Sequence, residues 1–151
     1  MEAARFAVES DLGAMRWVAE QVLHEQADAR GGDLFQRREA AGALESIPEA
    51  VAAGQGVVGT YDDVVLGYGI GITEELDDGS LLGRITALAV VADGRGSGIG
   101  EAIMNAMLER LRSDGCIGVD ATALPGDRHT KNFFESFGLK ARLLVVHRSF
   151  G

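Results

Sequence analysis

The sequence predicts an α/β fold organised around one strand, a glycine-rich turn and one helix. Residues 85–91 are almost entirely apolar, as in a central strand whose two faces are both covered. Residues 98–112 carry apolar side chains at helical spacing, with polar residues on the opposite side. Another strand is expected at residues 116–123. Because the helix connects it to the strand at residues 85–91, these two strands are expected to run parallel. The apolar ridge of the helix consists of Ile99, Ile103, Met107 and Leu111.

The N-terminal part of the chain is expected to form a strand and two helices. Residues 5–9 have the pattern of a short strand, and Ser10 or Asp11 can cap the helix that follows. That helix has an apolar stripe over residues 12–23. A second helix is expected around residues 36–46.

A β-hairpin is expected next, formed by residues 57–61 and 64–73 with Asp62-Asp63 at its turn. Glycine occupies every second position from Gly67 to Gly71, which leaves one face of this strand without side chains. Either a neighbouring element or a ligand is expected to pack closely on that face. The acidic residues 74–80 then turn the chain into the central strand.

The chain is expected to end with a short helix at residues 128–137, closed by Gly138, and a final strand at residues 139–147. The sheet is therefore mixed, mostly antiparallel with one parallel pair, and about four helices flank it. A chain of 151 residues, 46% hydrophobic and 25% charged, is expected to form one globular domain.

Charge and cysteine content make several kinds of partner unfavourable. The net charge of −9 disfavours nonspecific binding to nucleic acid or to an anionic membrane surface, and it is compatible with a cationic amine substrate. No apolar run reaches the length of a membrane span, and the N-terminus lacks the pattern of a signal peptide. Cys116 is the single cysteine, so no internal disulfide is expected and the expected location is the reducing cytoplasm.

The turn at residues 93–100 has the features of an anion site. Its four glycines weaken the start of the helix through their conformational entropy. They also allow a phosphate to approach the free N–H groups at the N-terminus of the helix, and Arg95 adds a charged donor. The alternative is a flexible turn that only connects two elements.

The spacing within the turn distinguishes between phosphate ligands. The dinucleotide fingerprint G-x-G-x-x-G is absent, and no Gly-Lys-Ser/Thr follows as in a Walker sequence. The spacing that is present is Arg95-x-x-Gly98-x-Gly100. Together with the strand segment Leu88-Ala89-Val90 before it and with residues 133–139, FFESFGL, this turn resembles the GNAT superfamily of acyl-CoA-dependent N-acyltransferases.

The resemblance implies a GNAT-like mixed sheet whose parallel pair splays apart at the CoA site, with acetyl-CoA as co-substrate and no metal. The main chain of the strand pairs with the pantetheine arm in that family, and the turn holds the pyrophosphate. The residues then expected at the pocket of an amine acceptor are Asp33, Leu34, Phe35 and Arg38, with a surface loop as the alternative. Those expected near the 3′-phosphate are Arg128, His129 and Lys131, with a solvated basic face as the alternative. The residues expected to bind acetyl-CoA are Leu88, Ala89, Val90, Arg95, Gly96, Ser97, Gly98, Ile99, Gly100 and Phe134.

Acetyl transfer to an amine requires a proton acceptor for the amine and a proton donor for the departing thiolate. The candidate catalytic residues are Tyr68, expected opposite Leu88, and Glu74, expected nearer the turn that follows the hairpin. Members of the family often carry a central-strand glutamate where this chain has Arg84, and many use a tyrosine as the acid where it has Phe134. The alternatives for the base are Asp120, Thr122 and a chain of water molecules.

The sequence thus favours an N-acetyltransferase that moves an acetyl group from acetyl-CoA to an amine of an unidentified small molecule or protein. A non-catalytic acyl-CoA-binding regulatory module of the same fold is the alternative, because Phe134 replaces the usual acid. A nucleotide-binding regulator is disfavoured by the missing fingerprints. The oligomeric state is left open, a homodimer included.

Overall fold

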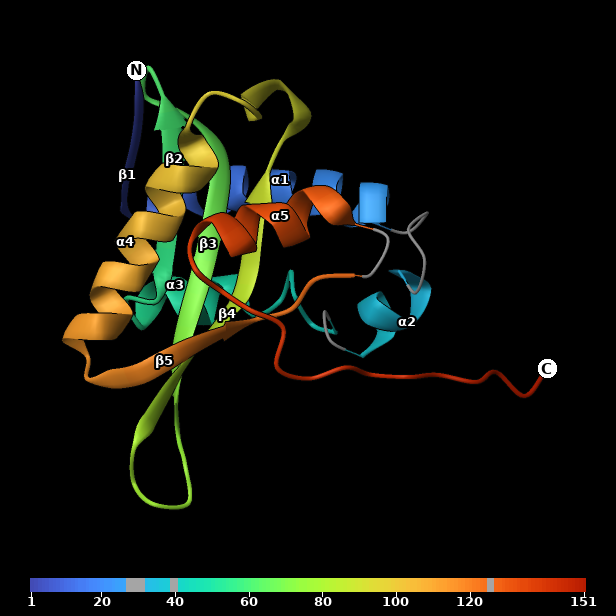
Figure 1. Cartoon of the computed structure of the whole chain (residues 1–151). Helices are drawn as coiled ribbons and strands as arrows, with labels where there is room; N and C mark the ends of the chain where they lie inside the picture. The colour runs from blue at the N-terminus through green and yellow to red at the C-terminus, as the bar shows by residue number, and fades with distance from the viewer. Residues whose placement is uncertain (27–31, 39–40, 125–126) are drawn as a thin grey trace.

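The computed structural model of the chain describes residues 1–26, 32–38, 41–124 and 127–151. Its centre is a five-stranded sheet in the order β1-β2-β3-β4-β5 (Figure 1). Neighbouring strands from β1 to β4 are antiparallel, whereas β4 and β5 are parallel, which confirms the predicted mixed sheet. The strands are β1 (Glu2–Phe6), β2 (Gly56–Tyr61), β3 (Val64–Glu75), β4 (Leu81–Val90) and β5 (Cys116–Ala121).

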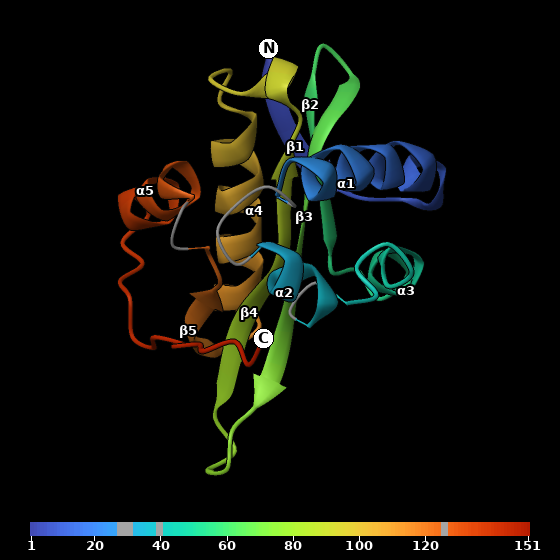
Figure 2. The same ribbon diagram turned by 90° about the vertical axis from the view of Figure 1, so that its right-hand side faces the viewer.

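Helices cover both faces of the sheet (Figure 2). Helices α4 and α5 lie on one face, and α1 and α3 lie on the other. No helix in the ranges that the structure describes is long and apolar enough to cross a membrane. The helices are α1 (Leu12–Gln26), α2 (Gly32–Arg37), α3 (Ile47–Ala52), α4 (Ile99–Ser113) and α5 (Arg128–Ser136), and the 3-10 turns are η1 (Glu9–Asp11) and η2 (Ala92–Gly94).

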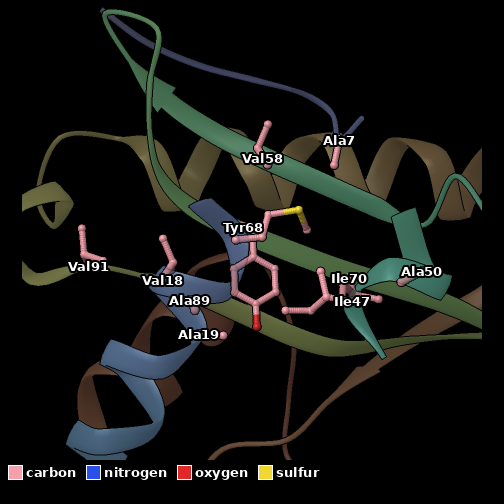
Figure 3. Close-up of a cluster of buried hydrophobic side chains, with 11 residues drawn as sticks. Ala7, Val18, Ala19, Ile47, Ala50, Val58, Tyr68, Ile70, Ala89 and Val91 are labelled. Atoms are coloured by element: carbon pink, nitrogen blue, oxygen red, sulfur yellow. The ribbon is translucent and has the colours of Figure 1, made fainter. Parts of the chain in front are cut away.

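The core on the α1 side of the sheet contains the one buried tyrosine of the hairpin. The ring of Tyr68 lies among Val18, Ala19 and Ile47, which come from α1 and α3 (Figure 3). Met15 is fully buried on the same side, so the apolar stripe predicted for the first helix faces the sheet. Burial of this stripe is what fixes α1 against β3 and β4.

The core on the α4 side is built on the ridge predicted from the sequence. Ile99, Ile103 and Met107 are fully buried there. A Cβ added at Gly69 would lie 2.7 Å from Met107 Sδ, so α4 packs directly on the bare backbone of β3. The close neighbour of the alternating glycines is therefore a helix and not a ligand.

The N-terminal strand differs from the prediction in its bounds. It ends at Phe6, because the chain turns into η1 after that residue and does not continue extended to Glu9. The guanidinium of Arg5 donates to both carboxylate oxygens of Asp11, at 2.7 and 2.9 Å, and Asp11 also accepts from the amide of Val8 at 2.8 Å. Asp11 therefore fixes the start of α1, because its side chain links η1 to the end of β1.

The second helix also differs from the prediction. The described residues place α2 at Gly32–Arg37, followed by turns at 41–46, where a helix over residues 36–46 was expected. Pro48 then lies in the first turn of α3, a position where its missing N–H is tolerated. Among the described residues between α1 and β2, the regular elements are therefore the two short helices α2 and α3.

The prediction of a final strand at residues 139–147 is wrong. Residues 139–151 carry no regular secondary structure, and all of them after Leu139 are exposed. A strand requires a neighbouring strand for its hydrogen bonds, and within the described residues this segment pairs with none. Figure 1 shows its end extending away from the sheet.

Candidate active site

Strand β4 is paired with β5 along only part of its length. The parallel register runs from Leu81 opposite Cys116 to Ile85 opposite Ala121, where β5 ends. β4 continues to Val90, so in the described chain its segment from Thr86 to Val90 has a partner strand, β3, on one side only. An unpaired strand edge presents free N–H and C=O groups. This edge can therefore accept an extended ligand by main-chain hydrogen bonding.

The glycine-rich turn carries this edge into the N-terminus of α4. Gly96 and Gly98 have φ of +82° and +87°, a conformation that glycine adopts readily and other residues do not. The first hydrogen bond of α4 runs from the amide of Ala102 to the carbonyl of Gly98. The N–H groups of Ile99 and Gly100 therefore have no acceptor inside the helix, and they lie at the positive end of its dipole.

Arg95 links the turn to the end of the first helix. Its Nε donates to the carbonyl of Val90 at 3.1 Å, and its Nη2 donates to the Glu25 carboxylate at 2.6 Å. Both side chains of the ion pair are about half-exposed, at 40% and 44%. Exposed pairs contribute only about 0–1 kcal/mol, so an arriving phosphate can compete for Arg95 at little cost.

The wall beside the turn is formed by α5. A Cβ added at Gly100 would lie 3.4 Å from the Phe133 ring, so α5 lies close to the N-terminal turn of α4. Phe134 is buried with the α4 ridge, which makes it a packing residue at the position where the resemblance would place a proton-donating tyrosine. Ser97 is held in the turn by donating its hydroxyl proton to the carbonyl of Gly94.

Tyr68 lies one residue away from its expected neighbour. It is opposite Ala89, and the prediction that it faces Leu88 is wrong, because the register of β3 and β4 shifts at a bulge between Ile70 and Gly71. Burial raises the pKa of the Tyr68 phenol to about 12, since the charged form would lose its hydration. At neutral pH the phenol is protonated, so it can donate a hydrogen bond but is a poor base.

Glu74 lies far from the glycine-rich turn. It is opposite Leu82, six residues before Leu88 on β4, a separation of about 20 Å along an extended strand. Its carboxylate accepts from Arg84, and both side chains are partly exposed. The structure therefore does not bring Glu74 together with the residues predicted to hold the acyl donor.

Three charged residues that no sequence pattern had brought together, Arg84, Asp120 and Arg142, lie where β4 and β5 separate. Asp120 is opposite Arg84 in the parallel register, and Arg142 of the C-terminal segment donates to the Asp120 carboxylate, with Nε–Oδ1 at 2.9 Å. The hydrogen bond from Arg142 lowers the pKa of Asp120, which keeps the carboxylate ionised. Arg142 is 22 residues from Asp120 in sequence, so no local pattern indicated this pair.

The residues expected near the acceptor and the 3′-phosphate are on separate helices. Asp33 and Leu34 are exposed on α2, and Phe35 is half-buried beside them. On α5, His129 is exposed and Lys131 forms an ion pair with Glu135 at 3.6 Å. Both sets are accessible at the surface.

Comparison with known families decides the relationship of the chain. The model of the acetyltransferase (GNAT) family matches residues 16–139. The chain belongs to the GNAT acetyltransferase family. A comparison with curated protein sequences finds no match.

Solved structures similar to this GNAT chain cover nearly its whole length. A mutant of the BH1408 protein of Bacillus halodurans superposes with a TM-score of 0.80 at 18% identity, over 97% of this chain and 98% of its own. Glucosamine-6-phosphate N-acetyltransferase from Arabidopsis thaliana gives 0.66 at 19%, over 100% and 99%. An aminoglycoside N-acetyltransferase in complex with CoA gives 0.75 at 14%, over 100% and 96%. At these identities the likeness establishes the fold.

Proposed function

We propose that this protein is an N-acetyltransferase that moves an acetyl group from acetyl-CoA to an amine of a small molecule or a protein. The observation that carries the proposal is the unpaired edge of β4 from Thr86 to Val90, which leads directly into free amides at the N-terminus of α4. In a GNAT fold this arrangement offers one continuous path for a pantetheine arm and a pyrophosphate.

The donor is proposed to bind along this path. The main chain of Leu88, Ala89 and Val90 would pair with the pantetheine amides, and the amides of residues 96–100 would surround the pyrophosphate. Arg95 would exchange its carboxylate partner for a phosphate oxygen, a stronger charge-assisted hydrogen bond. Phe134 contributes an apolar wall. The single, half-buried Cys116 is compatible with a reducing compartment such as the cytoplasm.

The transfer forms a C–N bond to the amine and breaks the C–S bond of the thioester. Alkyl amines have a pKa near about 10, so the nucleophile must lose a proton before or during attack. A main-chain N–H near Val90 would hydrogen-bond the thioester carbonyl and stabilise the charge that develops on its oxygen. Of the two candidate catalytic residues, Tyr68 lies beside this part of β4 and Glu74 does not.

We infer that water takes the proton of the amine. Tyr68 is neutral at working pH and serves better as a donor than as a base, because its pKa is raised to about 12. The thiolate is a good leaving group, with a pKa of about 8.5 in the cysteine case, so its protonation does not demand a strong acid. Holding donor and amine in line then supplies most of the acceleration.

A non-catalytic acyl-CoA-binding module is the second candidate function. It is favoured by Phe134, which is buried at the position where many family members have a tyrosine that acts as the general acid. Both candidates predict acetyl-CoA binding, and only the enzyme releases free thiol when an amine is supplied. A thiol-release assay over a panel of small amines and peptide amino groups separates them.

The proposal is tested first by calorimetric titration with acetyl-CoA, with ATP and NAD as controls. We expect selective micromolar binding of acetyl-CoA, and about tenfold or greater weakening in Arg95→Ala, because a charge-assisted hydrogen bond contributes about 1.5–3 kcal/mol. Arg16→Ala is the matched control, since Arg16 is also an exposed arginine paired with a glutamate. Absence of acetyl-CoA binding, or equal weakening by both variants, would refute the assignment of the site.

The same titration examines the partner of Arg95. Glu25→Gln frees Arg95 from its ion pair, so we expect acetyl-CoA to bind up to about fivefold more tightly, the range of one exposed ion pair. Glu20→Gln removes the same charge from a pair on α1 that does not involve the turn, and it should leave the affinity unchanged.

A further inference from the structure

Arg84 lies at the fork where strands β4 and β5 separate. The last pair of the parallel register joins Ile85 to Ala121, and Arg84 is opposite Asp120 immediately before it. The unpaired edge of β4, along which the acyl donor is proposed to bind, begins at Thr86. The path proposed for the donor therefore has the glycine-rich turn at one end and an arginine beside the other.

The side chain of Arg84 projects from the sheet face on which α1 and α3 lie. Arg84 is opposite Ile72 of β3, which packs against the core on that side, and residues directly opposite each other in an antiparallel pair share a face. The preceding residue, Gly83, faces the other way, and a Cβ added there would lie 3.1 Å from Leu111 of α4. Because α4 fills its own side of the sheet here, a ligand reaches Arg84 from the α1 side.

The guanidinium of Arg84 has hydrogen-bonding capacity to spare. Its Nη1 donates to the Glu74 carboxylate, whereas its Nε and Nη2 have no acceptor within the described residues. The side chain is 48% exposed, so these donors are accessible. A guanidinium carries five N–H donors in a planar fork that matches a carboxylate with two parallel hydrogen bonds. An anionic group can therefore bind Arg84 while Glu74 stays in place.

The carboxylates at the fork do not offer an equivalent site to a cation. Both oxygens of Asp120 accept from the guanidinium of Arg142, with Nε–Oδ1 at 2.9 Å. Glu74 in turn accepts from Arg84. A cationic group would have to displace one of these two guanidiniums or lie beside both of them. The open binding capacity at the fork is thus that of a positively charged donor, in a chain whose net charge is −9.

The spacing along β4 limits the length of a ligand that Arg84 could hold. Leu88 is the residue of the proposed donor site nearest to Arg84, and it is four residues away, about 13 Å along an extended strand. The arginine side chain spans only part of this distance. An α-amino acid carries its amine and its carboxylate on the same carbon, so it is too short to reach both places.

We propose that the acceptor is an amine that carries a carboxylate several bonds away, and that Arg84 binds this carboxylate. The inference rests on the proposed acetyltransferase function and adds the chemical class of its acceptor. A carboxylate suits the fork better than a phosphate, because Glu74 remains beside Arg84 and repels a doubly charged group more strongly than a singly charged one.

The test compares two acceptors that differ only in this charge. ε-Aminocaproate and its amide have the same chain and the same primary amine, and release of free thiol from acetyl-CoA reports the acetylation of each. We expect kcat/KM to be about tenfold or more higher for the carboxylate, because a charge-assisted hydrogen bond is stronger than a neutral one. β-Alanine should gain little over its own amide, because it is too short to reach Arg84.

Substitution of Arg84 assigns the preference to this side chain. Arg84→Gln should use ε-aminocaproate and its amide about equally, with the loss appearing as a higher KM for ε-aminocaproate. Arg84→Lys should retain part of the preference, because an ammonium keeps the charge but not the planar fork. Arg16→Gln is the matched control, since Arg16 is also an exposed arginine paired with a glutamate, and it should show the native preference. Calorimetric titration with acetyl-CoA should give similar affinities for all four proteins, which separates an effect on the acceptor from one on the donor.

The outcomes separate this inference from the proposed function. Equal use of ε-aminocaproate and its amide by the native protein would overturn the inference and leave the acetyltransferase activity standing. So would acetylation of other amines but not of ε-aminocaproate, or an undiminished preference in Arg84→Gln. If the native protein releases no thiol with any amine, the proposed function fails and the inference falls with it.

Discussion

At the scale of single residues, Tyr68 shows how burial changes what a side chain can do. Its phenol lies among apolar side chains of α1 and α3, and this burial raises its pKa to about 12. A group with a raised phenol pKa is neutral throughout the working range, so it does not titrate between pH 6 and 9. The pH dependence of acetyl transfer should then follow the amine substrate, whose neutral fraction rises with pH.

Tyr68→Phe is the substitution that tests this conclusion. We expect it to lower kcat by less than about tenfold and to leave the shape of the pH–rate profile unchanged, because a base typically contributes at least about 10²-fold. Steady-state kinetics over the pH range would check this. If kcat instead fell by 10²-fold or more and the pH–rate profile lost its limb at basic pH, Tyr68 would be assigned as the base.

At the scale of elements, the contact between α4 and the hairpin positions the anion turn. α4 packs on the glycine face of β3, and the same helix begins at the glycine-rich turn. The distance between the turn and the free edge of β4 therefore depends on glycine at positions with no space for a Cβ. Binding geometry and core packing are coupled through one helix.

Gly69→Ala should reveal the cost of disturbing that contact. The new Cβ would meet Met107 Sδ at 2.7 Å and Ile103 Cγ2 at 2.8 Å, and overpacking of this kind destabilises by about 1–3 kcal/mol. Gly13→Ala is the matched control, because no atom lies within 4 Å of a Cβ at that helical position. We expect the control to stabilise the protein by about 0.5 kcal/mol. Urea unfolding of the three proteins gives both values.

At the scale of the whole molecule, local patterns predicted most of the fold and part of the site. The strand predicted at residues 85–91 and the helix predicted at 98–112 correspond to β4 (Leu81–Val90) and α4 (Ile99–Ser113). Both follow from periodicity and glycine placement, which act over a few residues. The bulge that moves Tyr68 opposite Ala89 and the pair of Arg142 with Asp120 depend on how distant strands meet. Those features arise from tertiary packing, so a single sequence carries no local signal for them.

The C-terminal segment is the most instructive departure. A strand was expected at residues 139–147 as the one that completes a GNAT-like sheet, and the apolar residues 143–146 are typical of a strand. An apolar pattern indicates what conformation a segment favours, but a strand also needs a neighbouring strand for its hydrogen bonds, and the pattern does not say where that neighbour lies.

Stability toward acid is a property of the whole chain that depends strongly on one buried carboxylate. Arg5 lowers the pKa of Asp11 through two hydrogen bonds to its 7% exposed side chain, and the amide of Val8 adds a third. A carboxylate whose pKa is lowered by folding stabilises the native state above its unfolded pKa of about 3.9. That contribution disappears as the pH falls through the lowered value.

We therefore expect the free energy of unfolding to be nearly constant from pH 7 to about 5 and to fall steeply at lower pH. Asp11→Asn should lose about 1–3 kcal/mol at pH 7, because Arg5 keeps its charge without a charged acceptor, and its stability should fall less steeply in acid. Glu109→Gln removes the same charge from an exposed position on α4 and should keep the native acid profile. Denaturant unfolding across this pH range measures all three curves. Equal slopes in acid for the native chain and Asp11→Asn would mean that other carboxylates, such as Asp120 beside Arg142, carry the acid sensitivity.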